Sequence, residues 1–137
     1  MKNVAIEKSE DVLVLERFQA LGVARLHEWD ALVFLYGHAS SLVTAAQIAR
    51  LIGCDQGEIG AALRRLEALG LLQRSRDSQG VRLHQFSVPP EPARYACLLE
   101  LMTLAQTRTG RLLLLKHLQR PHPRAGMNGR DGGLRLA

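Results

Sequence analysis

Arginine side chains gather in one short stretch of the chain, and their chemistry suits anions. The members of this group, which lie within 19 consecutive positions, are Arg64, Arg65, Arg74, Arg76 and Arg82. A guanidinium is a planar fork of N–H donors that matches phosphate oxygens and guanine edges. The last three repel one another on a small predicted hairpin, where only Asp77 is near enough in sequence to offset them. These residues therefore favour contact with a polyanion.

Other chemically active residue types form no catalytic or metal-binding pattern. The sequence contains no GxSxG, phosphate-loop, HExxH or paired-carboxylate motif, so we expect no catalytic residues and no enzyme. Its five histidines share no ligand spacing with cysteines or paired acids, so we expect no metal ion and no cofactor. Cys54 and Cys97 lie far apart; we expect buried thiols, with a redox role as the alternative.

Length and charge are those of one basic globular domain. The 137 residues are 47% hydrophobic, and the net charge is +5. Residues 1–43 are net acidic, whereas residues 44–137 are net basic. No apolar run is long enough to span a membrane, and three acids lie within the first twelve residues, where a signal peptide would be apolar. We therefore expect a cytoplasmic protein without a membrane partner.

Two short helices joined by a tight turn are predicted in the middle of the chain. Thr44 and Gln47 form a capping-box pair, and Gly53 is suited to end that helix. Asp55 is the expected N-cap of the next helix, which runs to about Leu69. This order is typical of a helix-turn-helix.

The second of these helices has small residues where surface residues are usually large. With its apolar stripe turned inward, the residues left outside or at the flanks are Gln56, Gly57, Gly60, Ala61, Arg64 and Arg65. Each glycine inside a helix costs roughly 1 kcal/mol relative to alanine. The two glycines therefore favour a helix whose backbone approaches a DNA groove closely. The alternative is a solvated face on which Arg64 and Arg65 pair with neighbouring glutamates.

Further elements are predicted on both sides. They are helices at 9–21 and 24–38, a hairpin formed by 71–76 and 81–88, and a helical region at 92–119 that Gly110 is able to split. Residues 120–137 form a Pro/Gly/Arg-rich basic tail that we expect to be mobile. Trp29 and Tyr36 share a helix face; we expect core packing there, with a ligand pocket as the alternative.

A resemblance to a known family is carried by the segment TAAQIARLIGCDQGEIGAALRRLEALGLLQRSRDSQGVRLHQF. It resembles the DNA-binding core of the MarR-type winged-helix transcriptional regulators, and LHEWDALVFLY resembles the helix before that core. The likeness covers about residues 24–88 and is most specific in LxxLGLLxRxxD, although the wing DSQG is short. It implies cytoplasmic homodimers on pseudo-palindromic promoter DNA, with Asp77 and Arg82 at the positions of the family's minor-groove pair.

We therefore predict a mainly α fold: a winged helix-turn-helix with a two-stranded β-wing and flanking dimerisation helices. Residues 1–119 form one domain, with a DNA-binding core at about 24–88 and dimerisation helices at about 9–21 and 92–119. The predicted function is sequence-specific binding of double-stranded DNA by a homodimeric transcriptional regulator. A small-molecule effector of unknown identity remains open. The alternative is a winged-helix interaction module in a larger assembly that does not bind DNA specifically.

The predicted contacts with DNA and with a second copy can be named. Gln56, Gly57, Gly60, Ala61, Arg64 and Arg65 would line the major groove, while Arg74, Arg76 and Arg82 would grip phosphates or the minor groove. A monomer is expected to expose Leu98, Met102, Leu112, Leu113, Leu115 and Leu118, which a second copy would cover. The first helix would join this interface through Leu13, Leu15, Phe18 and Leu21.

Overall fold

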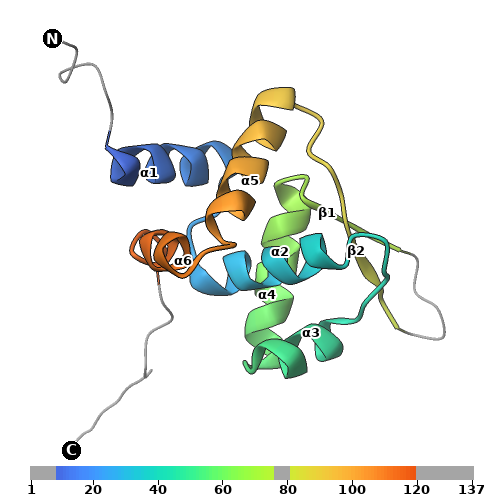
Figure 1. Ribbon diagram of the computed structural model, residues 1–137. Coiled ribbons are helices and arrows are strands. Elements are labelled where there is room, and N and C mark those ends of the chain that lie inside the picture. The colour runs from blue at the N-terminus through green and yellow to red at the C-terminus, as the bar shows by residue number, and fades with distance from the viewer. Residues whose placement is uncertain (1–8, 76–80, 120–137) are drawn as a thin grey trace, which may run out of the picture.

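Helices dominate the computed structural model, which describes residues 9–75 and 81–119. In chain order the elements of these ranges are α1 (Glu10–Leu21), α2 (Leu26–Gly37), α3 (Ala45–Ile52), α4 (Gln56–Ala68), β1 (Leu72–Arg74), β2 (His84–Phe86), α5 (Pro92–Leu104) and α6 (Arg108–Leu115) (Figure 1). This is the predicted mainly helical fold with a two-stranded wing. Within the described ranges, no helix is long and apolar enough to cross a membrane.

Local capping residues set the helix ends as the sequence predicts. Thr44 Oγ1 accepts a hydrogen bond from the backbone N–H of Gln47 at 3.1 Å, and the Gln47 side chain accepts one from the N–H of Thr44 at 2.8 Å. Asp55 caps α4 by accepting from the N–H of Glu58 at 3.2 Å. Gly53 ends α3 at a φ of 85°, in the left-handed region that favours glycine. The turn between α3 and α4 therefore forms for local reasons.

The wing is a short antiparallel pair. Leu72 faces Phe86, and Arg74 faces His84 across the two strands. Val43, just before α3, adds a bridge to His84 through two backbone hydrogen bonds of 2.7 and 2.9 Å. Both strands are shorter than the predicted β runs, although hydrogen bonds from the N–H of Ser75 to the carbonyl of Leu83 and from the N–H of Ser87 to the carbonyl of Leu71 extend the pairing by one residue at each end. Arg76, Asp77 and the rest of the predicted turn lie outside the described residues.

The core is centred on α2. This helix packs against α3, α4 and β2, while α1 packs mainly against α5. Its buried residues include Trp29, Leu32 and Leu35. The rings of Trp29 and of Phe18 from α1 form a T-shaped contact, with their centroids 5.4 Å apart. One apolar core therefore extends from the winged helix into the flanking helices.

Arg94 ties the flanking helices to the winged helix with hydrogen bonds. From α5 its guanidinium donates to the carbonyls of Ala20 and Leu21 at the end of α1, at 3.1 and 2.9 Å, and to the carbonyl of Leu69 after α4, at 2.8 Å. The ends of two helices carry partial negative charge, which a guanidinium neutralises. Arg94 thus fixes α1 and α5 relative to the end of α4.

The sequence leaves open whether Gly110 splits the C-terminal helical region, and the structure places the break before this glycine. The chain turns at residues 105–107, and Thr107 caps α6 by accepting from the N–H of Gly110 at 2.9 Å. Gly110 is buried inside α6, where an added Cβ would collide with the carbonyl of Leu104. The glycine is needed for close packing of the two helices rather than for the turn.

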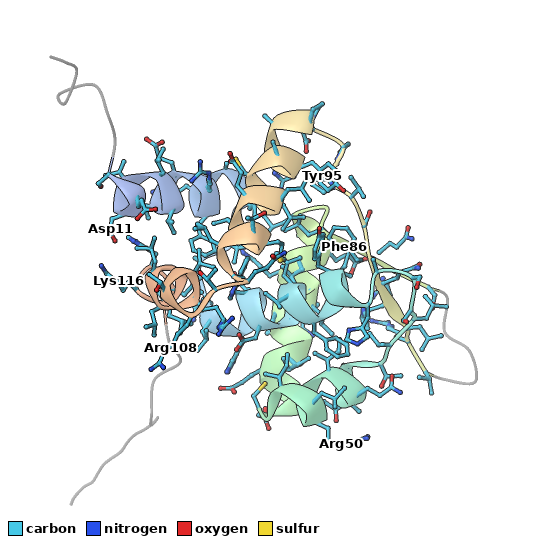
Figure 2. All side chains as sticks on the ribbon, viewed as in Figure 1. Asp11, Arg50, Phe86, Tyr95, Arg108 and Lys116 are labelled. Carbon is cyan, nitrogen blue, oxygen red and sulfur yellow. The ribbon has the colours of Figure 1, made fainter. Side chains whose placement is uncertain are left out.

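The prediction that a monomer exposes a large apolar patch is largely wrong, because most of these side chains pack against other residues of the same chain. The structure buries Leu98, Met102, Leu118, Phe18 and Leu21, whereas Leu13, Leu113 and Leu115 are half-buried. The apolar side chains left exposed on α1 and α6 are Val12, Leu15 and Leu112. Figure 2 shows Asp11 beside Lys116, where their 3.2 Å ion pair ties α1 to α6. The predicted tail, residues 120–137, lies outside the described residues.

Candidate nucleic-acid interface

A surface hollow of about 780 Å³ lies between α3, α4 and the wing. Its lining residues come from the start of α3, one side of α4 and both sides of the hairpin: Thr44, Ala45, Ala46, Gln56, Gly60, Leu63, Arg64, Glu67, Arg74, Val81, Arg82 and His84. We call this surface the winged-helix hollow. It brings together five of the residues predicted to bind DNA, from segments up to 26 positions apart.

The two adjacent arginines of α4 have different environments. Arg64 is exposed in the winged-helix hollow, and its Nη1 lies 3.6 Å from where a Cβ on Gly60 would be. Arg65 points to the other side of α4, where it donates to the carbonyl of Gly22 at 3.2 Å and lies 3.9 Å from a carboxylate oxygen of Glu28. Successive helix residues are about 100° apart, which separates the two side chains.

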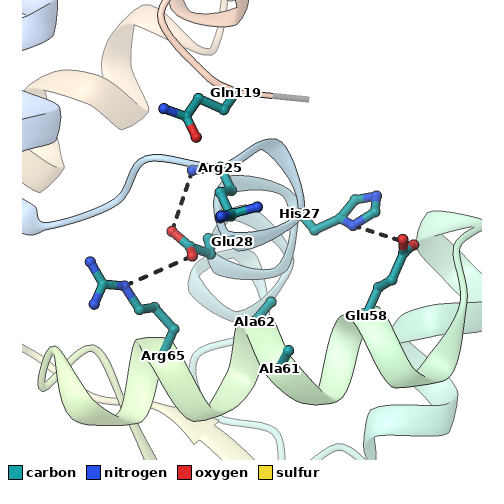
Figure 3. Close-up of a pocket in the computed structure, with 8 residues that line it drawn as sticks. All are labelled: Arg25, His27, Glu28, Glu58, Ala61, Ala62, Arg65 and Gln119. Carbon is teal, nitrogen blue, oxygen red and sulfur yellow. Dashed lines mark hydrogen bonds and ion pairs between the residues drawn. The ribbon is translucent and has the colours of Figure 1, made fainter. Parts of the chain in front are cut away.

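Glu28 anchors a second, smaller hollow of about 280 Å³ between α2 and α4 (Figure 3). This glutamate is only 5% exposed and accepts hydrogen bonds from the N–H groups of Ala24 and Arg25 at 3.1 and 3.4 Å. Ala61 and Arg65 line this hollow and not the winged-helix hollow. The structure therefore separates these two predicted DNA contacts from Gln56, Gly60 and Arg64.

Charge in the winged-helix hollow is positive but partly compensated. Arg74 lies 3.8 Å from the carboxylate of Glu67, a partner that the sequence analysis missed when it considered only Asp77. Glu67 and Arg74 are seven positions apart, and the fold of the hairpin back onto α4 brings them together. The remaining predicted residues are Gly57, which is exposed and lines neither hollow, and Arg76, which lies outside the described residues.

His84 is a further residue of this hollow that the sequence analysis did not select. It is 8% exposed, and its Nδ1 has no hydrogen-bond partner among the described residues. Burial is the main cause that lowers the pKa of His84, Arg74 and Arg82 lower it further, and Glu67 opposes them. The alternation of His84 and Phe86 on the same side of β2 is the signal that could have identified it.

An apolar pocket of about 600 Å³ lies on the far side of α2, between that helix, the end of α3 and α6. Trp29, Val33 and Phe34 contribute apolar walls, while Asp30 and Arg111 contribute charges. Burial raises the pKa of the Asp30 carboxyl. The Arg111 guanidinium is anchored by a 3.1 Å hydrogen bond to the carbonyl of Ala105. This pocket has the composition of a small-molecule site.

Redox and metal chemistry find little support in the described part of the chain. Both cysteines are half-buried, and burial, followed by the charges of Glu58, Asp30 and Asp55, raises the pKa of the Cys54 thiol. A raised pKa disfavours the reactive thiolate. No group of three or more His, Cys, Asp or Glu side chains among the described residues could hold a metal ion.

Comparison with known proteins finds one matching family model and several similar structures. Residues 21–82 match the model of the MarR family. Similar solved structures include a MepR mutant from S. aureus bound to an oligodeoxyribonucleotide (17% identity, 75% of this chain and 79% of that chain, TM-score 0.50). A second is a MarR-family regulator from Silicibacter pomeroyi (22% identity, 77% of this chain and 75% of that chain, TM-score 0.50). A third is a possible transcriptional regulator from Methanosarcina mazei Go1 (12% identity, 82% of this chain and 92% of that chain, TM-score 0.52). No curated protein sequence matches significantly. Residues 21–82 of the chain are therefore similar to the MarR family, and its fold is similar to that of solved transcriptional regulators.

Proposed function

We propose that this protein is a transcriptional regulator that binds specific sequences of double-stranded DNA as a homodimer. The observation that carries the proposal is the winged-helix hollow, in which Arg64, Arg74 and Arg82 outnumber Glu67, the one acid among its described lining residues. A similar fold is bound to an oligodeoxyribonucleotide in the MepR mutant. Promoter DNA as the partner implies action in the cytoplasm.

The geometry supports a division of labour at the DNA. The major groove, about 12 Å wide, admits one α-helix, and α4 is the helix whose exposed side borders the winged-helix hollow. The first residues of α3 border the same hollow, where the positive end of a helix dipole suits a phosphate. Arg74 and Arg82 of the wing then contact phosphates or the minor groove. Arg65 holds α4 against α2 instead of contacting bases.

Dimerisation would bury the apolar side chains that α1 and α6 leave exposed. Val12 and Leu15 are each 42% exposed, and Leu112 is 55% exposed. A two-fold axis at these helices would present two copies of α4 to half-sites about 34 Å apart, one turn of DNA. Leu112→Arg is the test, because it changes an exposed residue: sedimentation should show a shift from dimer to monomer, with weaker binding to a two-half-site duplex. A wild-type monomer at micromolar concentration would contradict the dimer.

Selection from a pool of random duplexes tests the function directly. A regulator enriches a motif with two-fold symmetry, whereas no enrichment at low salt favours the interaction module.

Arg82→Ala should weaken binding to all duplexes and reduce the slope of log K against log salt by about one unit. Arg108→Ala is the matched control, because this exposed arginine lies on α6, away from the wing in Figure 2. An unchanged slope for a folded Arg82→Ala protein would remove Arg82 from the interface.

The apolar pocket beside α2 favours a second part of the proposal, regulation by a small aromatic effector. Trp29 is the chain's one tryptophan and lines this pocket, so its fluorescence reports occupancy directly. A compound that changes this emission should also change the affinity for DNA, and Asp30→Asn should alter its binding. Compounds that release DNA without any effect on Trp29 emission would argue against this pocket.

A further inference from the structure

The exposed side of α4 offers few groups that can distinguish one base pair from another. Gly57, Gly60, Ala61 and Ala68 have no hydrogen-bonding side chain. On the side that borders the winged-helix hollow, only Gln56, Arg64 and Glu67 have polar side chains. Direct readout in the major groove depends on hydrogen bonds to base edges, so these three residues are the candidates.

Existing contacts separate these candidates. Glu67 is 3.8 Å from Arg74 and is therefore part of the wing's charge balance. Arg65, the neighbouring cation on α4, is occupied by Glu28 and the carbonyl of Gly22. Across residues 9–75 and 81–119, no hydrogen bond or ion pair engages the side chain of Arg64 or of Gln56. Their donors can reach a base without breaking a protein contact.

The spacing between these two side chains follows from the position of the Arg64 guanidinium. Arg64 lies back along α4, with Nη1 at the level of Gly60, 3.6 Å from the Cβ position there. From Gly60 to Gln56 the helix rises about 6 Å, at 1.5 Å per residue. Base pairs are stacked about 3.4 Å apart along the DNA axis, and a helix in the major groove crosses this axis obliquely, so the two side chains are separated by at most about two base pairs.

Gly60 makes this arrangement possible. A larger side chain at position 60 would occupy the space over which the guanidinium lies, and would lift Arg64 away from the helix surface. The sequence analysis explained this glycine by a close approach of the backbone to DNA. The structure adds a second reason, which concerns the placement of a neighbouring arginine.

We propose that Arg64 and Gln56 together carry the base specificity of α4, Arg64 by contacting a guanine and Gln56 by contacting an adenine at most about two base pairs away in each half-site. Arginine is bidentate to O6 and N7 of guanine, and glutamine is bidentate to N6 and N7 of adenine. The small residues beside them have no side-chain hydrogen bonds to offer, so α4 discriminates less strongly between base pairs at the other positions of the groove. This inference rests on the proposed function.

Selection from random duplexes with matched variants tests the assignment. Arg64→Lys keeps the charge but loses the planar fork, so its enriched motif should show a weaker preference for the guanine while the salt slope is retained. The motif enriched by Gln56→Ala should lose only its preference for the adenine. Each variant should bind the wild-type operator about 5- to 150-fold more weakly, the range of a bidentate contact. Arg108→Ala should enrich the wild-type motif. Circular dichroism and thermal melting verify that every variant is folded.

The outcomes separate this inference from the proposed function. If wild-type protein enriches a motif but Arg64→Lys and Gln56→Ala enrich the same motif, the base assignment is wrong while the function stands. If Arg64→Ala weakens binding to all duplexes equally and reduces the slope of log K against log salt, Arg64 contacts a phosphate and the assignment is again wrong. If the wild-type protein enriches nothing at low salt, the proposed function itself fails.

Discussion

Replacing Gly60 should improve stability and impair DNA binding at the same time. Among the described residues, the only atom beyond the helix's own backbone within 4 Å of a Cβ added at this position is Nη1 of Arg64 at 3.6 Å, an ordinary van der Waals distance. Alanine therefore fits, and the helix gains about 1 kcal/mol because glycine is the poorer helix former. For a chain of this length, that gain corresponds to a rise in Tm of about 3–5 °C.

Leucine at position 60 separates the two effects further. It also favours the helix over glycine, but its branched carbons would fill the space beneath the Arg64 guanidinium. We expect Gly60→Leu to fold, and to lose about 5- to 150-fold in affinity for the operator, the range of one bidentate base contact. Urea titration followed by circular dichroism measures the free energy of unfolding, and fluorescence anisotropy with labelled duplex measures the affinity.

Gly37→Ala is the matched control for an added Cβ. Gly37 ends α2, has no contacting atom from the described part of the chain within 4 Å of its Cβ position, and does not line the winged-helix hollow. This variant should bind DNA like the wild type. A folded Gly60→Leu protein with unchanged affinity and unchanged motif would refute the proposed orientation of α4. Loss of stability in Gly60→Ala would contradict the conclusion that a Cβ fits at this position without a clash.

Three further outcomes are expected from buried residues. Gly110→Ala should lower the free energy of unfolding in urea titrations, because its Cβ collides with a backbone carbonyl of Leu104; stability equal to wild type would contradict the packing of α5 on α6. Glu28→Ala should cost about 1–3 kcal/mol in the same assay, since it leaves the N–H groups of Ala24 and Arg25 just before α2 without their acceptor and releases Arg65. The lowered pKa of His84 means that the unfolded chain binds a proton more readily, so stability should fall as pH drops below 6.5. His84→Phe should show less of this fall, and an identical pH profile would exclude His84 as its source.

Features that depend on neighbouring residues could be predicted from the sequence. The predicted N-caps Thr44 and Asp55 and the predicted helix end at Gly53 act within three or four positions, and the structure confirms these three. A capping side chain needs only the next turn of its own helix to form its bond. The turn of the helix-turn-helix therefore follows from short sequence patterns.

Contacts between distant elements could not be predicted in the same way. The partner of Arg65 is Glu28, which lies 37 positions away, and the burial of Leu98 depends on how α5 packs against α1. The amphipathic pattern of 92–119 shows an apolar surface but does not state whether the same chain or a second copy covers it. For this reason the extent of the exposed patch was overestimated.

Arg64 and Arg65 illustrate why a cluster of charges in sequence is not one site. Both were assigned to DNA from their type and position, and a solvated face was the alternative. The α-helix directs one to the winged-helix hollow and the other to the buried carboxylate of Glu28. An arginine already held by a carboxylate and a carbonyl must break these contacts before it binds a phosphate, whereas Arg64 has no such cost within the described structure. Neighbouring residues of the same type can therefore divide between holding the helix in place and contacting its ligand.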